Sequence, residues 1–141
     1  MKADKVTLVQ YQTLAELRYA LRRFLRFSEK AAYAAGVTPQ QHQAMLAIKG
    51  FRGRDLITIG ELAERLQVLH HSAVGLVDRL VSEKYVRRSP GREDRRKVCL
   101  ALTPRGEVTL RRLSTVHREQ LQHIGPHISE LFKELTISKL D

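Results

Sequence analysis

The sequence predicts a mainly α-helical fold with one small two-stranded β element. Three observations lead to this prediction. Apolar residues recur at helical spacing over most of the 141 residues. Two threonines are each followed three residues later by Gln or Glu, which is the capping-box pattern of helix N-termini. A short stretch near residue 100 alternates with a period of two beside an Arg-rich turn, which indicates a hairpin.

The first two helices are predicted from periodicity and from their ends. The segment "YQTLAELRYALRRFLRFSEKAAY" reads as one long helix, and Gly36 is the residue type that ends such helices. In "TPQQHQAMLAIKG", Thr38 suits the N-cap, Pro39 suits the first helical position, and Gln41 can reach back to the cap. A second helix therefore starts directly after the threonine.

A helix-turn-helix is expected next. After the basic loop "KGFRGRD", the apolar "LIT" is predicted as a short strand, and Thr58 with Glu61 forms a second capping box that opens a helix over 59–66. Three residues, 67–69, separate it from another helix near 70–84, which is the spacing of a helix-turn-helix.

The two sides of that last helix differ in chemistry. One side is predicted to face the core and carries Ala73, Val74, Val77, Leu80 and Val81. The other carries short or hydrogen-bonding side chains that can enter a DNA major groove, namely His71, Ser72, Gly75, Arg79 and Ser82, with Leu76 beside them. We expect a glycine there to permit close approach of the backbone to a base edge; a tolerated surface glycine is the alternative.

The hairpin is expected to form a wing. "YVRRS" and "KVCLAL" bracket the turn "SPGREDRRK", in which Pro90-Gly91 is a strong turn signal. In the second strand, Val98, Leu100 and Leu102 alternate with Lys97, Cys99 and Ala101, so the side with the large apolar residues is predicted to be buried. A winged helix-turn-helix core is the result.

Charge indicates what the wing binds. The net charge is +10 and the isoelectric point about 10.3, which favours a polyanionic partner. Seven cationic side chains and only two carboxylates lie between residues 84 and 97. We expect the wing to reach the DNA minor groove, whose negative potential attracts arginine. The expected contacts of the wing are Arg88, Arg92, Asp94, Arg95, Arg96 and Lys97. A solvated basic surface, or a non-specific or architectural nucleic-acid binder, remains the alternative.

The sequence resembles the MarR family of bacterial winged helix-turn-helix transcriptional regulators. The resemblance runs through "ITIGELAERL", "SAVGLVDRL" and "RSPGREDRRKVCLALTPRG", within residues 36–106. It implies that Asp94 braces Arg96, that Arg96 reaches the minor groove, and that His71, Ser72, Gly75 and Arg79 contact DNA. Where family members usually have glycine before the first wing strand, this chain has Lys84. Either Lys84 is left-handed at some energetic cost, or the helix ends differently.

The two ends of the chain are predicted to be helices that form a homodimer. Their apolar stripes exceed what a small winged core can cover, and pairing across a two-fold axis would bury them. The resulting domain plan is one domain over 1–141, with a DNA-binding core over 36–106 and dimerisation helices over 1–35 and 107–141. At Gly125-Pro126 we expect a kink, or a break and restart.

The resemblance also implies a small-molecule effector that releases the DNA. A phenolic or carboxylate compound would bind between the dimerisation helices and the winged core, in a pocket lined by Tyr11, Tyr19, His42 or His117. We therefore expect a sequence-specific transcriptional regulator that binds a pseudo-palindromic operator and acts as a repressor.

Other classes of function find little support in the sequence. It has no glycine-rich phosphate loop, no GxSxG and no HExxH, so we expect no enzyme and no cofactor. His123 and His127 have metal-ligand spacing but lack partner ligands nearby, and a redox role for Cys99 is disfavoured. Arg18, Arg22 and Arg26 form a basic stripe that we interpret as solvated, with contact to an anionic ligand or to flanking DNA as the alternative. A single cysteine, no signal-peptide pattern and no long apolar run favour a cytoplasmic protein without a membrane span.

Overall fold

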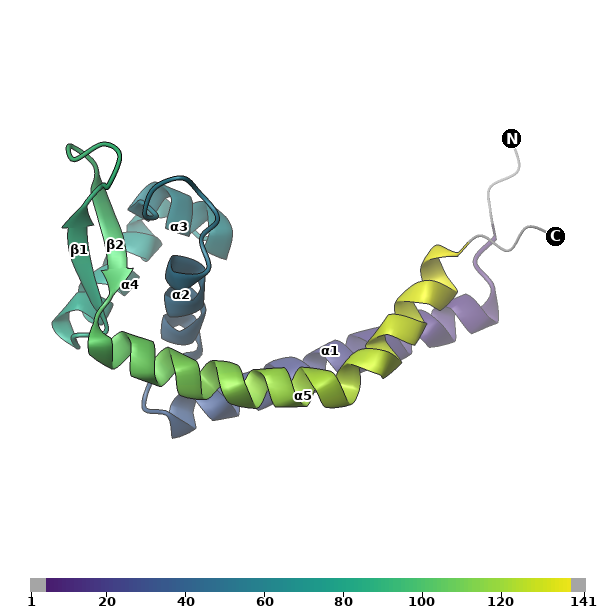
Figure 1. Ribbon diagram of the computed structural model, residues 1–141. Coiled ribbons are helices and arrows are strands. Elements are labelled where there is room, and N and C mark those ends of the chain that lie inside the picture. Colours follow the sequence, from purple (N-terminus) through teal and green to yellow (C-terminus); the bar gives the residue numbers. More distant parts are fainter. Residues whose placement is uncertain (1–4, 138–141) are drawn as a thin grey trace. The chain divides into compact units, whose positions relative to one another are not determined.

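The computed structural model describes residues 5–137, in five helices and one two-stranded sheet (Figure 1). The helices are α1 (Leu8–Ala34), α2 (Pro39–Lys49), α3 (Ile59–Leu66), α4 (His70–Ser82) and α5 (Pro104–Thr136), and the strands are β1 (Val86–Pro90) and β2 (Val98–Leu102). The predicted fold class is confirmed. The contacts divide the chain into a winged unit, residues 31–114, and a helical unit, residues 1–30 with 115–141.

Both predicted capping boxes are present in the winged unit. The Gln41 backbone N–H donates to the Thr38 hydroxyl at 3.1 Å, and the Thr38 N–H donates to the Gln41 side chain at 2.9 Å. Thr58 and Glu61 make the same reciprocal pair at the start of α3. Gly36 has φ +85°, as expected of a residue that ends a helix. These local signals set where α2 and α3 begin.

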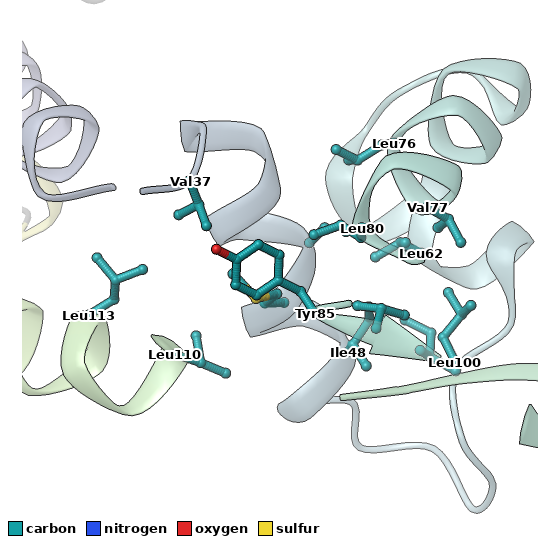
Figure 2. Packing of buried hydrophobic residues seen from close by; sticks show 14 of the residues in the cluster. Val37, Ile48, Leu62, Leu76, Val77, Leu80, Tyr85, Leu100, Leu110 and Leu113 are labelled. Atoms are coloured by element: carbon teal, nitrogen blue, oxygen red, sulfur yellow. The ribbon is translucent and has the colours of Figure 1, made fainter. Parts of the chain in front are cut away.

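One apolar core holds the winged unit together (Figure 2). Most of its members come from α2, α3, α4, both strands and the start of α5, and the largest fully buried ones include Met45, Ile57, Leu62, Leu80 and Leu100. Leu76, expected beside the exposed face of α4, is instead only 7% exposed and belongs to this core. That expectation was wrong because the apolar side of α4 is wider than one stripe.

The sheet differs from the prediction in one respect. β1 and β2 pair antiparallel, with Val86 opposite Leu102 and Arg88 opposite Leu100. The predicted alternation in β2 is wrong, because Val98 is 59% exposed whereas Cys99 and Leu100 are both fully buried.

The segment before α3 explains that pattern. The predicted strand "LIT" is reduced to an isolated bridge between Thr58 and Cys99, and the Leu100 N–H donates to the Ile57 carbonyl oxygen at 2.9 Å. This segment therefore lies along the free edge of β2 and contributes to burying Cys99.

The base of the wing has a tight geometry. Lys84 is left-handed with φ +66°, the first of the two alternatives left by the sequence. The Thr103 hydroxyl donates to the Lys84 carbonyl oxygen at 2.5 Å and accepts from the Gly106 N–H at 3.1 Å. A Cβ on Gly106 would collide with the Tyr85 carbonyl oxygen. Only glycine therefore fits where α5 starts against the end of the wing.

The helical unit consists of the greater part of α1 and of α5. Within it the Thr13 hydroxyl donates to the Glu134 carboxylate at 3.1 Å. A break at Gly125-Pro126 does not occur, because α5 runs unbroken through Pro126. No helix within residues 5–137 is long and apolar enough to cross a membrane.

Candidate nucleic-acid interface

α4 presents an open polar face. Its buried side, which includes Ala73, Val77 and Leu80, fixes the helix in the core. On the other side His71, Ser72 and Arg79 are exposed. Nothing lies within 4 Å of the position that a Cβ on Gly75 would take, so packing within the chain does not require glycine there. The face is free to receive another molecule.

The turn before α4 sets the angle of this helix. Residues 67–69 separate α3 from α4, as predicted, and Gln67 is left-handed with φ +54°. The Val68 N–H donates to the Ala63 carbonyl oxygen at 3.0 Å, which closes the end of α3. Leu69 caps α4 without a side-chain hydrogen bond, so amides of its first turn remain available to an anion such as a phosphate.

The loop 91–97 carries the wing's cationic side chains. Arg92, Arg95, Arg96 and Lys97 are all exposed, between the end of β1 and the start of β2. Figure 1 shows this loop at the tip of the two strands. Four of the seven cationic residues that the sequence predicted as a cluster are thus together on one short loop, as are all the predicted wing contacts except Arg88.

Asp94 holds Arg96 in place. Its carboxylate accepts from the Arg96 backbone N–H at 3.0 Å, from Nε at 3.1 Å and from Nη2 at 3.2 Å. The Arg96 side chain, and then its backbone N–H, lowers the pKa of Asp94. The carboxylate therefore stays ionised at neutral pH. The Arg96 side chain that it holds is 92% exposed.

Arg88 has a different partner from the loop arginines. Its Nη2 lies 2.5 Å from the Asp78 carboxylate on α4. Arg88 therefore links β1 to α4. Among the predicted DNA contacts within residues 5–137, Arg88 has a side chain that is already paired with a carboxylate on another element.

Asp55 contacts the wing loop and was missed by the sequence analysis. It lies in the loop between α2 and α3, and its carboxylate accepts from the Arg92 N–H at 2.7 Å, 37 residues further along the chain. The Arg92 N–H is the largest of several backbone donors that lower the pKa of Asp55 to about 2. The only signal in the sequence was a lone acidic residue at the end of a basic loop, which does not indicate its partner.

The residues expected to bind an effector are divided between the two units. His42 is 2% exposed in the winged unit, whereas Tyr11, Tyr19 and His117 belong to the helical unit. Tyr19 lines a groove of about 540 Å³ between α1 and α5, and Tyr11 is exposed two turns earlier on α1. The structure therefore does not gather the four residues in one unit.

His117 lies in an aromatic setting. Its Nε2 is 2.8 Å from the Ser28 hydroxyl, and its ring packs edge-on to Phe24 and Phe27, with centroids 6.0 and 5.5 Å away. The groove beside Tyr19 has these same two phenylalanines among its lining residues.

Two weaker candidates from the sequence are His127, of the His123–His127 pair, and Cys99. His127 contacts Glu16 at 3.4 Å, and within residues 5–137 no cluster of three or more His, Cys, Asp or Glu could hold a metal ion. Burial raises the pKa of the Cys99 thiol, which opposes the thiolate that a redox sensor needs.

Comparison with known proteins agrees with this geometry. The sequence pattern described as the MarR family matches residues 35–97, from the end of α1 through the wing loop. A protein of Thauera aromatica, proposed as the transcriptional regulatory protein for the hcr operon, is 28% identical over 133 residues. The match covers 91% of this chain and 78% of that protein.

Solved structures share the fold over nearly the whole chain. AbsC, a MarR family transcriptional regulator from Streptomyces coelicolor, superposes with a TM-score of 0.71 at 19% identity, covering 95% of this chain and 94% of AbsC. RV1404 from Mycobacterium tuberculosis gives 0.68 at 25% identity, covering 87% and 82%. A mutant of MepR from S. aureus, solved with a bound oligodeoxyribonucleotide, gives 0.64 at 16% identity, covering 96% and 87%. Residues 35–97 of this chain therefore match the MarR family, and nearly the whole chain shares the winged helix-turn-helix fold of a MarR family transcriptional regulator.

Proposed function

We propose that this chain is a sequence-specific repressor that acts in the cytoplasm as a homodimer on a pseudo-palindromic operator. Residues 36–106 would bind DNA, and residues 1–35 and 107–141 would form the dimer. The observation that carries the proposal is the pairing of two chemically different surfaces in one winged unit: an open polar face on α4 and a loop of exposed arginines. The first suits base edges in the major groove, and the second suits the narrow, negative minor groove.

Selecting bound fragments from random-sequence DNA tests this proposal. We expect enrichment of an inverted repeat whose half-sites lie about one helical turn, roughly 10 base pairs, apart. An enriched sequence without two-fold symmetry would contradict the proposal that a symmetric homodimer binds the operator.

Non-specific or architectural DNA binding is the second candidate, and the net charge of +10 favours it. Specific DNA-binding proteins prefer their site over random DNA by a factor of about 10³–10⁷. Equal affinity of the full chain for all duplexes would therefore favour the second candidate over the first.

The dimer is supported by the exposed apolar side chains of the helical unit. Each of the following is more than 40% exposed: Leu14, Tyr19, Leu25, Leu121 and Phe132. A surface of this kind in a chain of this size is typical of a protein–protein interface. Light scattering at micromolar concentration should give twice the mass of 16.2 kDa, and a clean monomer would contradict the proposal.

Release by an effector is the last part of the proposal. The groove beside Tyr19 supports it, because Phe24 and Phe27 give it aromatic walls and Arg23 provides a cation for a phenolic or carboxylate compound. Such a compound weakens DNA binding only if it prefers a conformation that binds DNA poorly. The test measures operator affinity in the presence of a broad panel of aromatic acids and phenols. If none of them changes that affinity, release by an effector is contradicted, whereas the proposal of DNA binding is not affected.

A further inference from the structure

Three consecutive amides of the wing loop converge on one carboxylate outside the wing. Besides the Arg92 N–H, the N–H groups of Glu93 and Asp94 lie 3.2 and 3.4 Å from Oδ2 of Asp55. Successive backbone N–H groups that point to one concave site form an anion-binding nest. In this protein the anion in the nest is a side chain of the chain itself.

The loop leaves no room for a bulkier residue at its start. The Gly91 N–H donates to the Lys97 carbonyl oxygen at 3.1 Å and closes the loop. A Cβ on Gly91 would collide with the Asp94 carbonyl oxygen and would meet Oδ2 of Asp55 at 2.7 Å. The loop is thus wrapped closely around the carboxylate.

Asp55 is itself held firmly. Its own Oδ1 also accepts from the Leu56 N–H at 2.7 Å, and the next residue, Ile57, is fully buried. Ile57 accepts the hydrogen bond of Leu100 in β2, as described above. The carboxylate therefore projects from a segment that is fixed to the sheet and can act as an anchor.

We propose that Asp55 is a positioning residue for DNA binding, which holds the wing loop in the conformation that presents Arg92, Arg95 and Arg96 to the duplex. This inference rests on the proposed DNA contacts of the wing. An anchored loop loses less conformational entropy when its long side chains bind, so the anchor strengthens binding although its own charge repels DNA.

The anchor and a simple charge effect predict opposite signs. If only charge matters, removing a carboxylate from a surface that meets DNA tightens binding. If Asp55 anchors the loop, its removal weakens binding. Glu93 offers a matched control, because its exposed carboxylate lies on the same loop and has no hydrogen bond or ion pair to the described residues.

The experiment titrates full-length wild type, Asp55→Ala and Glu93→Ala on the selected operator and on a random duplex at two salt concentrations. We expect Asp55→Ala to weaken binding to both duplexes about tenfold, which corresponds to about 1.4 kcal/mol, and to reduce the salt dependence. Glu93→Ala should bind equally or slightly more tightly. Tighter binding by both variants would overturn the proposal.

A second comparison shows whether Asp55 acts through the arginines. In a chain that carries Arg92→Ala, Arg95→Ala and Arg96→Ala, the change Asp55→Ala should no longer alter DNA affinity. A full tenfold loss that persists in this background would overturn the positioning role, since Asp55 would then act elsewhere.

The amide signals of the loop give a readout independent of DNA. In ¹H–¹⁵N spectra, Asp55→Ala should shift the signals of Arg92, Glu93 and Asp94 and accelerate their hydrogen exchange, while signals of α4 stay in place. Asp55→Asn keeps one acceptor oxygen and should give a smaller change of each kind, and this variant carries the test if Asp55→Ala does not fold. Unchanged loop signals would overturn the inference. Failure to select any operator would count against sequence-specific regulation, whereas the Asp55 comparison on random DNA would still stand.

Discussion

The two surfaces that we assign to DNA are held in place by different forces. α4 is a regular helix whose buried side fixes it, and its exposed side chains His71, Ser72 and Arg79 have no side-chain hydrogen bond or ion pair to any residue between 5 and 137. The wing loop, residues 91–97, joins β1 to β2 and lies outside the ladder of backbone hydrogen bonds that pairs the two strands. It is held instead by the carboxylates of Asp55 and Asp94.

This difference shows that apolar packing positions the helix, whereas polar interactions position the loop. A helix aims its side chains through backbone geometry, so its contact residues can remain unpaired until DNA arrives. An irregular loop has many conformations, and fixing it requires hydrogen bonds that the backbone alone does not supply. Asp55 and Asp94, although acidic, therefore belong to the DNA-binding surface that we propose, because they hold its loop in place.

The largest expected effect comes from the core that both surfaces share. Leu80 is fully buried, so Leu80→Ala should lower the free energy of unfolding by about 2–5 kcal/mol. Urea unfolding measures this loss. Arg79→Ala, at the neighbouring exposed position, should change it by no more than about 0.5 kcal/mol. If the two variants were equally stable, α4 would not be held by its buried side.

The next effect separates α4 from the wing. His71→Ala and Ser72→Ala should each lower operator affinity by about 1–3 kcal/mol, because base contacts are lost, with little change on random DNA. Fluorescence anisotropy with both duplexes measures the difference. An equal loss on both duplexes would mean that these residues contact phosphate and do not read bases.

Gly75→Ala should have effects of opposite sign on stability and binding. Since the added Cβ meets nothing within 4 Å, the helix should gain about 0.5–1 kcal/mol in stability. The same methyl group would stand between α4 and the base edges and should weaken operator binding. Thermal unfolding and anisotropy test the two signs, and unchanged operator affinity would show that the backbone does not approach the DNA closely at this point.

The smallest effect is a pH dependence in the wing. The pKa of Asp55 is lowered to about 2 and that of Asp94 is lowered as well, so both contribute to stability above their unfolded pKa. That contribution is lost as the pH falls from about 4 towards 2. The melting temperature of Asp55→Asn should therefore fall less steeply than that of wild type across this range. Parallel curves would contradict the ionised anchor.

Local signals in the sequence predicted most of the fold. The N-caps at Thr38 and Thr58, the end of α1 at Gly36 and the three-residue turn before α4 depend on neighbours within a few positions. Such interactions can be read from spacing. Lys84 also took one of the two conformations that the sequence left open.

The errors arose where distant segments meet. The alternation in β2 failed at Val98 because the segment around Ile57 lies along the far edge of the strand. Asp55 was missed because its partners lie 37 to 39 residues away, and no periodicity connects them.

The central claim is that the carboxylates bound to the wing loop, those of Asp55 and Asp94, strengthen DNA binding by holding the arginines, and Asp94 tests this claim most directly. Arg96→Ala should weaken binding to operator and random duplex alike and should reduce the slope of log K against log salt by about one unit per protomer if Arg96 also contacts phosphate.

The decisive measurement is the affinity of Asp94→Ala for both duplexes at two salt concentrations, with Arg96→Ala titrated beside it. The account predicts that Asp94→Ala weakens binding in part, although it removes a negative charge, because an Arg96 side chain without its partner samples more conformations before binding. Tighter binding of Asp94→Ala to both duplexes would contradict the account and reduce the wing to a patch of positive charge.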